Sequence, residues 1–104
     1  MKLSYEKLYD AVVVLLTASG VSPDASRTVA ESLVRANARG IHSHGVKYLK
    51  MITARIKAGQ MEIAEAPSVV SASHANALVD GKNGIGQVAA TLAATFVGFR
   101  AGLL

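Results

Sequence analysis

The stretch S-G-V-S-P-D-A-S, residues 19–26, ends one helix and begins another, so it decides the fold of the first half of the chain. Gly20 is typical of the residue that follows a helix end. Ser22 and Pro23 are typical of an N-cap and the first helical residue, and Asp24 adds a favourable carboxylate to the first turn. The sequence therefore predicts two helices joined by a short turn.

Apolar residues at helical spacing extend this prediction in both directions. The first helix begins after Ser4, a good N-cap with Glu6 in the first turn, and runs to Gly20. The second helix runs from Pro23 to Arg39, and Gly40 follows as the residue beyond its end. The expected buried residues are Leu8, Val12, Leu15 and Leu16 in the first helix and Val29, Leu33 and Ala36 in the second.

A third helix is predicted to start near Ser43, whose hydroxyl is expected to cap its first amides. Its apolar face consists of Val46, Leu49, Ile52 and Ile56, and Ala58-Gly59 closes it. Residues 1–60 therefore form a helical N-terminal segment.

The pattern changes after residue 60. Val69-Val70 and Ala77–Val79 are typical of two short strands around a turn at 74–76, where we expect a solvated His74. Asp80–Gly84 is a strong loop signal, and residues 87–100 predict a helix that is apolar nearly all round and expects burial on several sides. We therefore predict an α+β or truncated α/β fold: a three-helix segment, then two short strands and a helix. Residues 61–104 would be the start of a truncated α/β cofactor domain.

Composition limits the class of protein. A chain of 104 residues makes one domain or part of one, and with no cysteine it has neither disulfides nor Cys-type zinc sites. The net charge of +4 comes from scattered Lys and Arg, so nucleic acid is not an expected partner. The apolar run 11–18 is too short to cross a bilayer, and no signal peptide is evident. We expect a cytoplasmic protein without membrane contact.

The sequence R-G-I-H-S-H-G-V-K-Y-L-K, residues 39–50, gathers the groups that carry chemistry. His42 and His44 do not share a helix face and no Cys or carboxylate cluster completes a ligand set, so no metal site is expected. A Ser43-His44 nucleophilic pair lacks an elbow such as G-x-S-x-G and an orienting acid.

The remaining role for His44 is proton transfer, the work to which histidine side chains are generally suited. Ser43 is expected to position a polar group of a substrate, and Gly45 to let the substrate approach the backbone. Cationic and phenolic contacts to a carboxylate are expected from Arg39, Lys47, Tyr48 and Lys50. The alternative is that His44 only caps a helix or lies on the surface.

G-I-G-Q-V-A, residues 84–89, matches the pattern G-x-G-x-x-A between a strand and a helix. Gly84 and Gly86 are thus weak candidates for holding a pyrophosphate. A glycine loop that allows close helix packing is the other explanation, because the loop is longer than the motif's tight turn and the acidic residue expected about twenty positions on would lie beyond Leu104.

The motifs R-G-I-H-S-H-G-V and D-G-K-N-G-I-G-Q together resemble the N-terminal portion of the malate/L-lactate dehydrogenase family, over residues 3 to about 100. The residues of the first motif are most similar to those of the ureidoglycolate dehydrogenase branch. The family also includes diketogulonate reductases. The resemblance implies an NAD- or NADP-dependent oxidoreductase and a small 2-hydroxy acid, 2-oxo acid or ureido acid as substrate. It implies that His44 is the catalytic proton donor or acceptor and that Ser43, Gly45, Lys47 and Tyr48 bind substrate.

Two features depart from the family pattern. Tyr48 stands where family members commonly have an arginine, and a phenol does not neutralise a substrate carboxylate. Family enzymes are several times longer, so most of the cofactor site would lie beyond residue 104. We therefore expect the N-terminal part of an oxidoreductase, inactive alone and homo-oligomeric, as a homodimer. The alternative is a non-enzymatic helical dimerisation or interaction module derived from such an enzyme.

Overall fold

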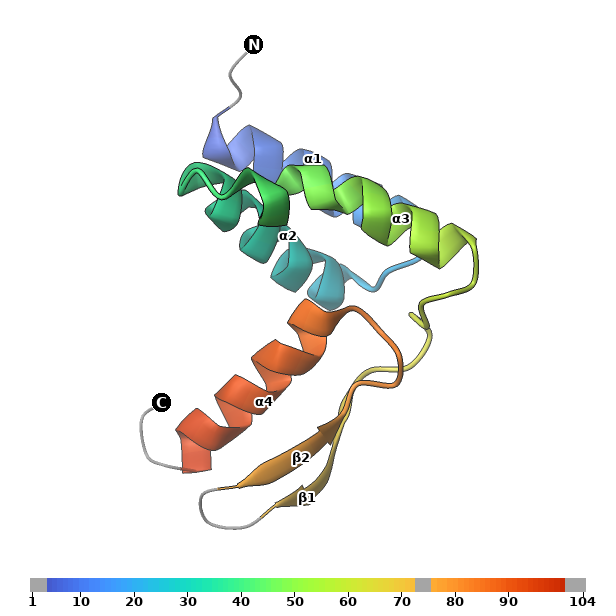
Figure 1. Cartoon of the computed structure of the whole chain (residues 1–104), viewed down its shortest axis with the longest axis vertical. Coiled ribbons are helices and arrows are strands. Elements are labelled where there is room, and N and C mark those ends of the chain that lie inside the picture. The colour runs from blue at the N-terminus through green and yellow to red at the C-terminus, as the bar shows by residue number, and fades with distance from the viewer. Residues whose placement is uncertain (1–3, 73–75, 101–104) are drawn as a thin grey trace.

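The computed structural model describes residues 4–72 and 76–100. In chain order its elements are α1 (Tyr5–Ala18), α2 (Pro23–Ala38), the 3₁₀ turns η1 (His42–His44) and η2 (Val46–Tyr48), α3 (Leu49–Lys57), β1 (Ser68–Ala72), β2 (Ala77–Asp80) and α4 (Gly86–Arg100). Helices α1, α2 and α3 pack together, and the hairpin and α4 form a second layer beside the start of α2 (Figure 1). The predicted succession of three helices, two strands and a helix is confirmed.

The starts of α1 and α2 confirm the predicted caps. The Ser4 hydroxyl accepts a hydrogen bond from the Lys7 amide at 3.2 Å, and the Ser22 hydroxyl accepts one from the Ala25 amide at 3.3 Å. Pro23 is the first residue of α2, where its missing N–H leaves no backbone acceptor unsatisfied.

Helices α1, α2 and α3 end in the same type of turn. The amide of the second residue beyond the cap donates to the carbonyl five positions earlier, which is the Schellman pattern. The three bonds are Val21 to Leu16 at 3.1 Å, Ile41 to Ala36 at 2.9 Å and Gln60 to Arg55 at 2.9 Å. Each turn passes through a glycine in the left-handed region, at Gly20, Gly40 and Gly59.

The core lies between α1, α2 and α3. Its largest fully buried apolar side chains are Val12, Leu16, Val29, Leu33, Val34 and Ile52. Ser26 is buried with them and its hydroxyl donates to the Val21 carbonyl at 3.3 Å while accepting from the Thr17 hydroxyl, also at 3.3 Å. Ile85, from the loop before α4, joins this core at 5% exposure, so the second half of the chain is anchored to the first.

Two details of the predicted helices are wrong. Leu15 is 52% exposed, because α1 packs on one side only and Val12 and Leu16 occupy that side. The third helix begins at Leu49 and not near Ser43, because Gly45 has an extended backbone that separates two short 3₁₀ turns from each other. The Ser43 hydroxyl therefore makes no cap to a helix.

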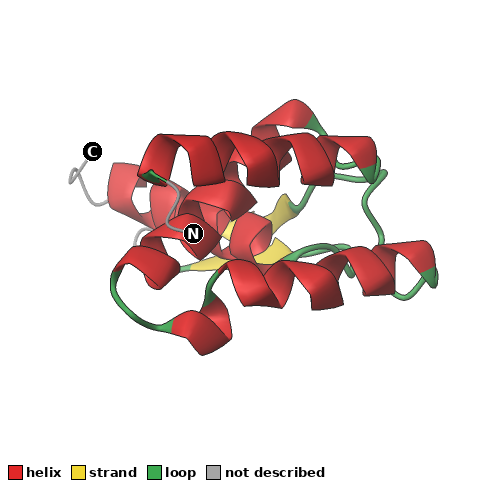
Figure 2. Cartoon of the chain, turned by 90° about the horizontal axis from the view of Figure 1, so that it is seen from above, coloured by secondary structure: helices red, strands yellow, loops and turns green. Residues whose placement is uncertain are grey.

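Strands β1 and β2 pair antiparallel, as predicted, with an irregularity between Val69 and Ser71. The side chains of Val70 and Leu78 are 59% and 60% exposed. The turn predicted at 74–76 includes His74, which lies outside the described residues with the rest of 73–75. Seen from above, the strands lie beneath the helices (Figure 2).

The loop after β2 is a tight turn closed by the Gly84 amide and the carbonyl three residues earlier, at 2.9 Å. Its central residues Lys82 and Asn83 both have φ of 56°, which is the type I′ geometry. Asn83 stabilises this conformation, because its side-chain amide donates to the Gln60 carbonyl at 3.2 Å and its carbonyl accepts from the Glu62 amide at 2.8 Å. The hairpin is thereby bound to the segment that follows α3.

Helix α4 contacts α2 and the hairpin, but the burial expected on several sides is not reached within this chain. Val97 is 39% exposed, and several other apolar side chains along α4 are only partly covered. Among the described residues, no helix combines the length and the apolar character needed to cross a membrane.

Replacing Leu33 by Ala should lower the free energy of unfolding by about 3 kcal/mol, since the side chain is fully buried and leaves a cavity. The matched change Leu15→Ala should lower the free energy of unfolding by less than about 0.5 kcal/mol, because about half of that side chain is exposed to solvent. Urea unfolding followed by circular dichroism measures both. Equal losses in the two variants would contradict the packing described for α1.

Candidate functional site

Residues 42–48 form two consecutive 3₁₀ turns between α2 and α3. The turns are held by amides of His44, Gly45 and Tyr48, which donate to the carbonyls of Ile41, His42 and Gly45 at 3.2, 3.2 and 2.9 Å. The side chains of Ser43 and His44 are exposed. The sequence motif therefore forms a compact reversal that presents a hydroxyl and an imidazole to solvent.

The His44 imidazole has two neighbours. Its Nδ1 lies 3.0 Å from the Ser43 hydroxyl oxygen, and its ring stacks on the Tyr48 ring with centroids 6.4 Å apart and planes 11° from parallel. When Nδ1 carries the proton it donates to Ser43, and the Nε2 lone pair is then free to accept a proton. In the part of the chain that the structure describes, Nε2 has no hydrogen-bond partner.

Gly45 is buried against the last turn of α2. A Cβ at this position would lie 2.6 Å from Oδ1, 3.1 Å from Cβ and 3.2 Å from Cα of Asn37. Glycine is required here by contact with the protein itself, a reason that its place in the sequence did not reveal. The space between Gly45 and Asn37 is filled by Asn37 itself. Approach of a substrate to Gly45 stays a prediction.

The predicted cationic residues are not brought together. Tyr48 is half-buried against the core and adjoins His44. Lys47 is exposed in the same turn, whereas Arg39 lines a hollow between α2 and α4 and Lys50 lines another beside Ser19. The structure thus places Ser43, His44, Lys47 and Tyr48 in one segment and separates Arg39 and Lys50 from them.

The two histidines face different partners. Nδ1 of His42 lies 3.4 Å from Oδ1 of Asn37, whereas His44 contacts Ser43 and Tyr48. Within residues 4–72 and 76–100, no group of three or more His, Asp or Glu side chains is arranged to hold a metal ion.

Gly84 does not fit the phosphates of a nicotinamide nucleotide. A Cβ on Gly84 would lie 3.1 Å from the carbonyl oxygens of both Glu62 and Gly81, and the Gly84 amide already donates to Gly81. Ile85 is buried in the core. A phosphate-binding turn needs free amides and open space at its glycines, and of the two candidate positions only Gly86 has such space.

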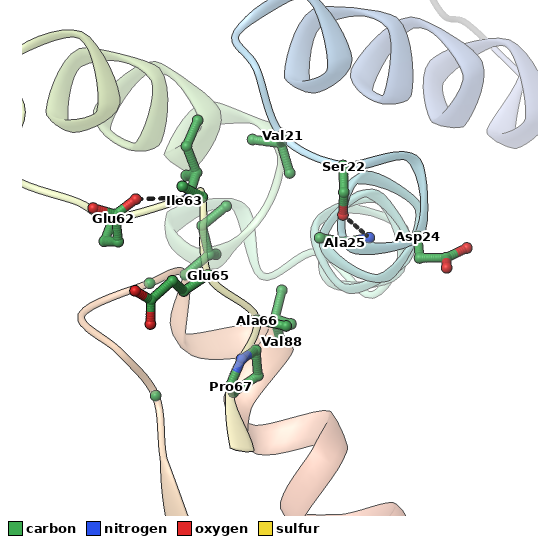
Figure 3. A pocket seen from close by; sticks show the side chains of 14 residues that line it. Val21, Ser22, Asp24, Ala25, Glu62, Ile63, Glu65, Ala66, Pro67 and Val88 are labelled. Carbon is green, nitrogen blue, oxygen red and sulfur yellow. Dashed lines mark hydrogen bonds between the residues drawn. The ribbon is translucent and has the colours of Figure 1, made fainter.

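A pocket lies away from His44, between the start of α2, the segment 62–67 and the start of α4 (Figure 3). It has a volume of about 300 Å³, and its lining includes the acidic residues Asp24, Glu62 and Glu65. Glu62 accepts from the Ala64 amide at 2.7 Å, and Glu65 lies 3.9 Å from the Lys82 ammonium. Sequence reasoning missed this pocket, since no motif marks residues 60–67. Its acidic lining makes it a poor site for an acid substrate, so the open surface at His44 remains the candidate site.

Comparison with known proteins shows which family this chain belongs to. Residues 3–100 match the family model described as malate/L-lactate dehydrogenase. Malate dehydrogenase of Pyrococcus horikoshii is 34% identical over 88 residues, which are 85% of this chain and 24% of that protein. Ureidoglycolate dehydrogenase (NAD(+)) of Escherichia coli K12 is 35% identical over 92 residues, which are 88% of this chain and 26% of that protein.

The fold agrees with these matches. The solved structure of malate dehydrogenase from Pyrococcus horikoshii superposes with a TM-score of 0.92 at 30% identity, over 98% of this chain and 29% of that one. The chain therefore spans about a quarter of the length of the curated relatives it matches and corresponds to their N-terminal portion.

Replacing Gly45 by Ala should lower the free energy of unfolding by about 1–3 kcal/mol, because the added methyl group would overlap Asn37. The matched change Gly86→Ala meets no atom within 4 Å and should leave stability unchanged or raise it by up to about 1 kcal/mol. Thermal unfolding of the two variants measures the difference. A Gly45→Ala protein as stable as the Gly86→Ala protein would show that the turn does not pack on α2.

Proposed function

The chain belongs to the malate/L-lactate dehydrogenase family. On that premise we propose that it supplies the proton-transferring residue on one side of an oxidoreductase active site for small 2-hydroxy and 2-oxo acids. The observation that supports this role is the Ser43–His44 contact of 3.0 Å, which occupies Nδ1 and leaves Nε2 without a partner among the described residues. An imidazole whose Nε2 is free can accept one proton from a substrate and return it.

In the proposed reaction, oxidation of a 2-hydroxy acid releases the hydroxyl proton to Nε2 of His44. Reduction of the 2-oxo acid reverses this step, and the imidazolium returns the proton to the carbonyl oxygen. Ser43 keeps the ring in one tautomer by accepting from Nδ1, and the parallel Tyr48 ring limits its rotation.

Substrate contacts in this proposal come from Ser43, Gly45, Lys47 and Tyr48. Lys47 supplies the one positive charge among them, so it would attract the carboxylate. The Tyr48 hydroxyl is neutral and offers one hydrogen bond, which fits an uncharged group such as the amide of a ureido acid.

The hydride partner proposed for this reaction is NAD or NADP. Gly84 is closed to such a nucleotide and Gly86 alone does not make a phosphate site, so we assign its binding to none of the described residues of this chain. The 104-residue chain by itself is accordingly proposed to be inactive.

A second proposal is a helical interaction module that associates with itself. It is supported by the exposed apolar side chains Val70, Leu78 and Val97 on the hairpin and α4. Exposed apolar side chains favour association when they can be buried against a second copy. The two proposals are compatible, since an oligomeric chain can also contribute to an oxidoreductase site.

Replacing the matching segment of E. coli ureidoglycolate dehydrogenase with residues 3–100 should give an enzyme whose turnover depends on His44. In this chimera His44→Ala should lower kcat by about 10²- to 10⁴-fold, because it removes the proton acceptor. Steady-state kinetics with ureidoglycolate, malate and lactate measure the loss.

The matched control is His74→Ala, for which we expect kcat within a factor of about two of the parent chimera. A His44→Ala chimera as active as the His74→Ala chimera would rule out proton transfer by His44. In the isolated chain, fluorescence titration with NADH and NADPH should show no saturable binding up to millimolar nucleotide, and saturation at micromolar nucleotide would contradict our assignment.

Self-association should depend on the exposed apolar side chains. We expect Val97→Lys to shift the 104-residue protein toward the monomer, because a charge on this surface disfavours its burial. Sedimentation equilibrium of the parent and the variant measures the shift, with the solvent-exposed change Thr95→Lys on the same helix as control. A parent protein that stays monomeric at high concentration would contradict the module proposal.

A further inference from the structure

Asn37, in the last turn of α2, touches the reversal that carries His44 at three points. Its carbonyl accepts from the Gly40 amide at 3.1 Å, at the start of the reversal. Its side-chain Oδ1 lies 3.4 Å from Nδ1 of His42. Its Cα, Cβ and Oδ1 fill the space beside Gly45, at the end of the reversal.

The side-chain contacts of Asn37 are specific in chemistry and in shape. Oδ1 is only an acceptor, so the hydrogen bond requires that His42 carry its proton on Nδ1. The contact with Gly45 leaves no room for even one methyl group. Close packing of this kind excludes alternative backbone positions, because a shift of a few tenths of an ångström creates overlap on one side.

Ser43 and His44 lie between these two anchored residues and are themselves exposed. Among the described residues, the contacts of the His44 imidazole are local, with Ser43 and Tyr48. The orientation of the imidazole therefore depends on the backbone at 42–45, and that backbone is held on α2 by Asn37.

We propose that Asn37 is a positioning residue for His44: it holds the His42–Gly45 turn on α2 so that the Ser43–His44 pair presents Nε2 in one orientation. This inference rests on the proposed function for its importance to catalysis, but the positioning itself is a property of the free chain. Asn37 would not touch substrate or nucleotide.

The test is nuclear magnetic resonance of the ¹⁵N-labelled 104-residue protein, with Asn37→Ala as the main variant. In the parent, the amides of 42–45 should have order parameters of about 0.85, and in Asn37→Ala they should fall below about 0.6. The two ring nitrogens of His44 should shift toward the values of a solvent-exposed histidine that exchanges between tautomers. Alanine is a better helix former than asparagine, so α2 itself is expected to remain intact.

Two further variants control the result. Asn37→Asp keeps both the size and the acceptor oxygen, and should restore the parent order parameters at 42–45. Asn76→Ala makes the same chemical change at an exposed position outside α2, and should leave both readings unchanged.

Unchanged order parameters at 42–45 and unchanged His44 nitrogen shifts in Asn37→Ala would overturn the proposal, even if the variant were less stable overall. If Asn37→Ala does not fold, Asn37→Ser replaces it and the same two readings decide. No substrate or nucleotide enters this experiment. A chimera in which His44 proves dispensable would therefore refute the proposed function without affecting the answer about Asn37.

Discussion

One backbone hydrogen bond at the end of each of the first three helices sets the direction of the chain. The bond runs from the amide of the second residue beyond the cap to the carbonyl five positions earlier, and it exists only because a glycine takes the left-handed conformation between them. At Gly20 this reversal lays α2 against α1, so that Leu16 and Leu33 share one core. At Gly40 it returns the chain toward the helix it has just left.

That second reversal connects the fold with the candidate site. Because the chain turns back at Gly40, Gly45 comes to lie on Asn37, and the residues between them are held in a short loop over the end of α2. His44 is thereby exposed while its backbone segment is packed on α2, as our proposal for proton transfer requires. The 3.0 Å contact with Ser43 involves Nδ1, so Nε2 is the ring nitrogen without a partner among the described residues.

Local patterns in the sequence predicted most of this fold, because caps and glycine turns act over a few residues. Ser4 and Ser22 start their helices as expected. Features that depend on packing were harder to predict from the sequence. Leu15 fits the helical spacing but lies on the solvent side of α1. The motif around His44 was found from its residue types, whereas the need for glycine at 45 arises from Asn37, eight positions earlier, and no short pattern reports such a contact.

The turn at Lys82-Asn83 has a consequence for how the molecule opens and closes. The loop after α3 has little regular structure of its own, yet its Glu62 amide bonds to Asn83, twenty-one positions later in the chain. The three helices form from contacts close in sequence, but this bond exists only once the hairpin has closed. Opening of the hairpin therefore exposes the backbone amide hydrogen of Glu62 to solvent. The hydrogen-exchange rate of this amide reports how often the hairpin opens, even while the helical core stays folded.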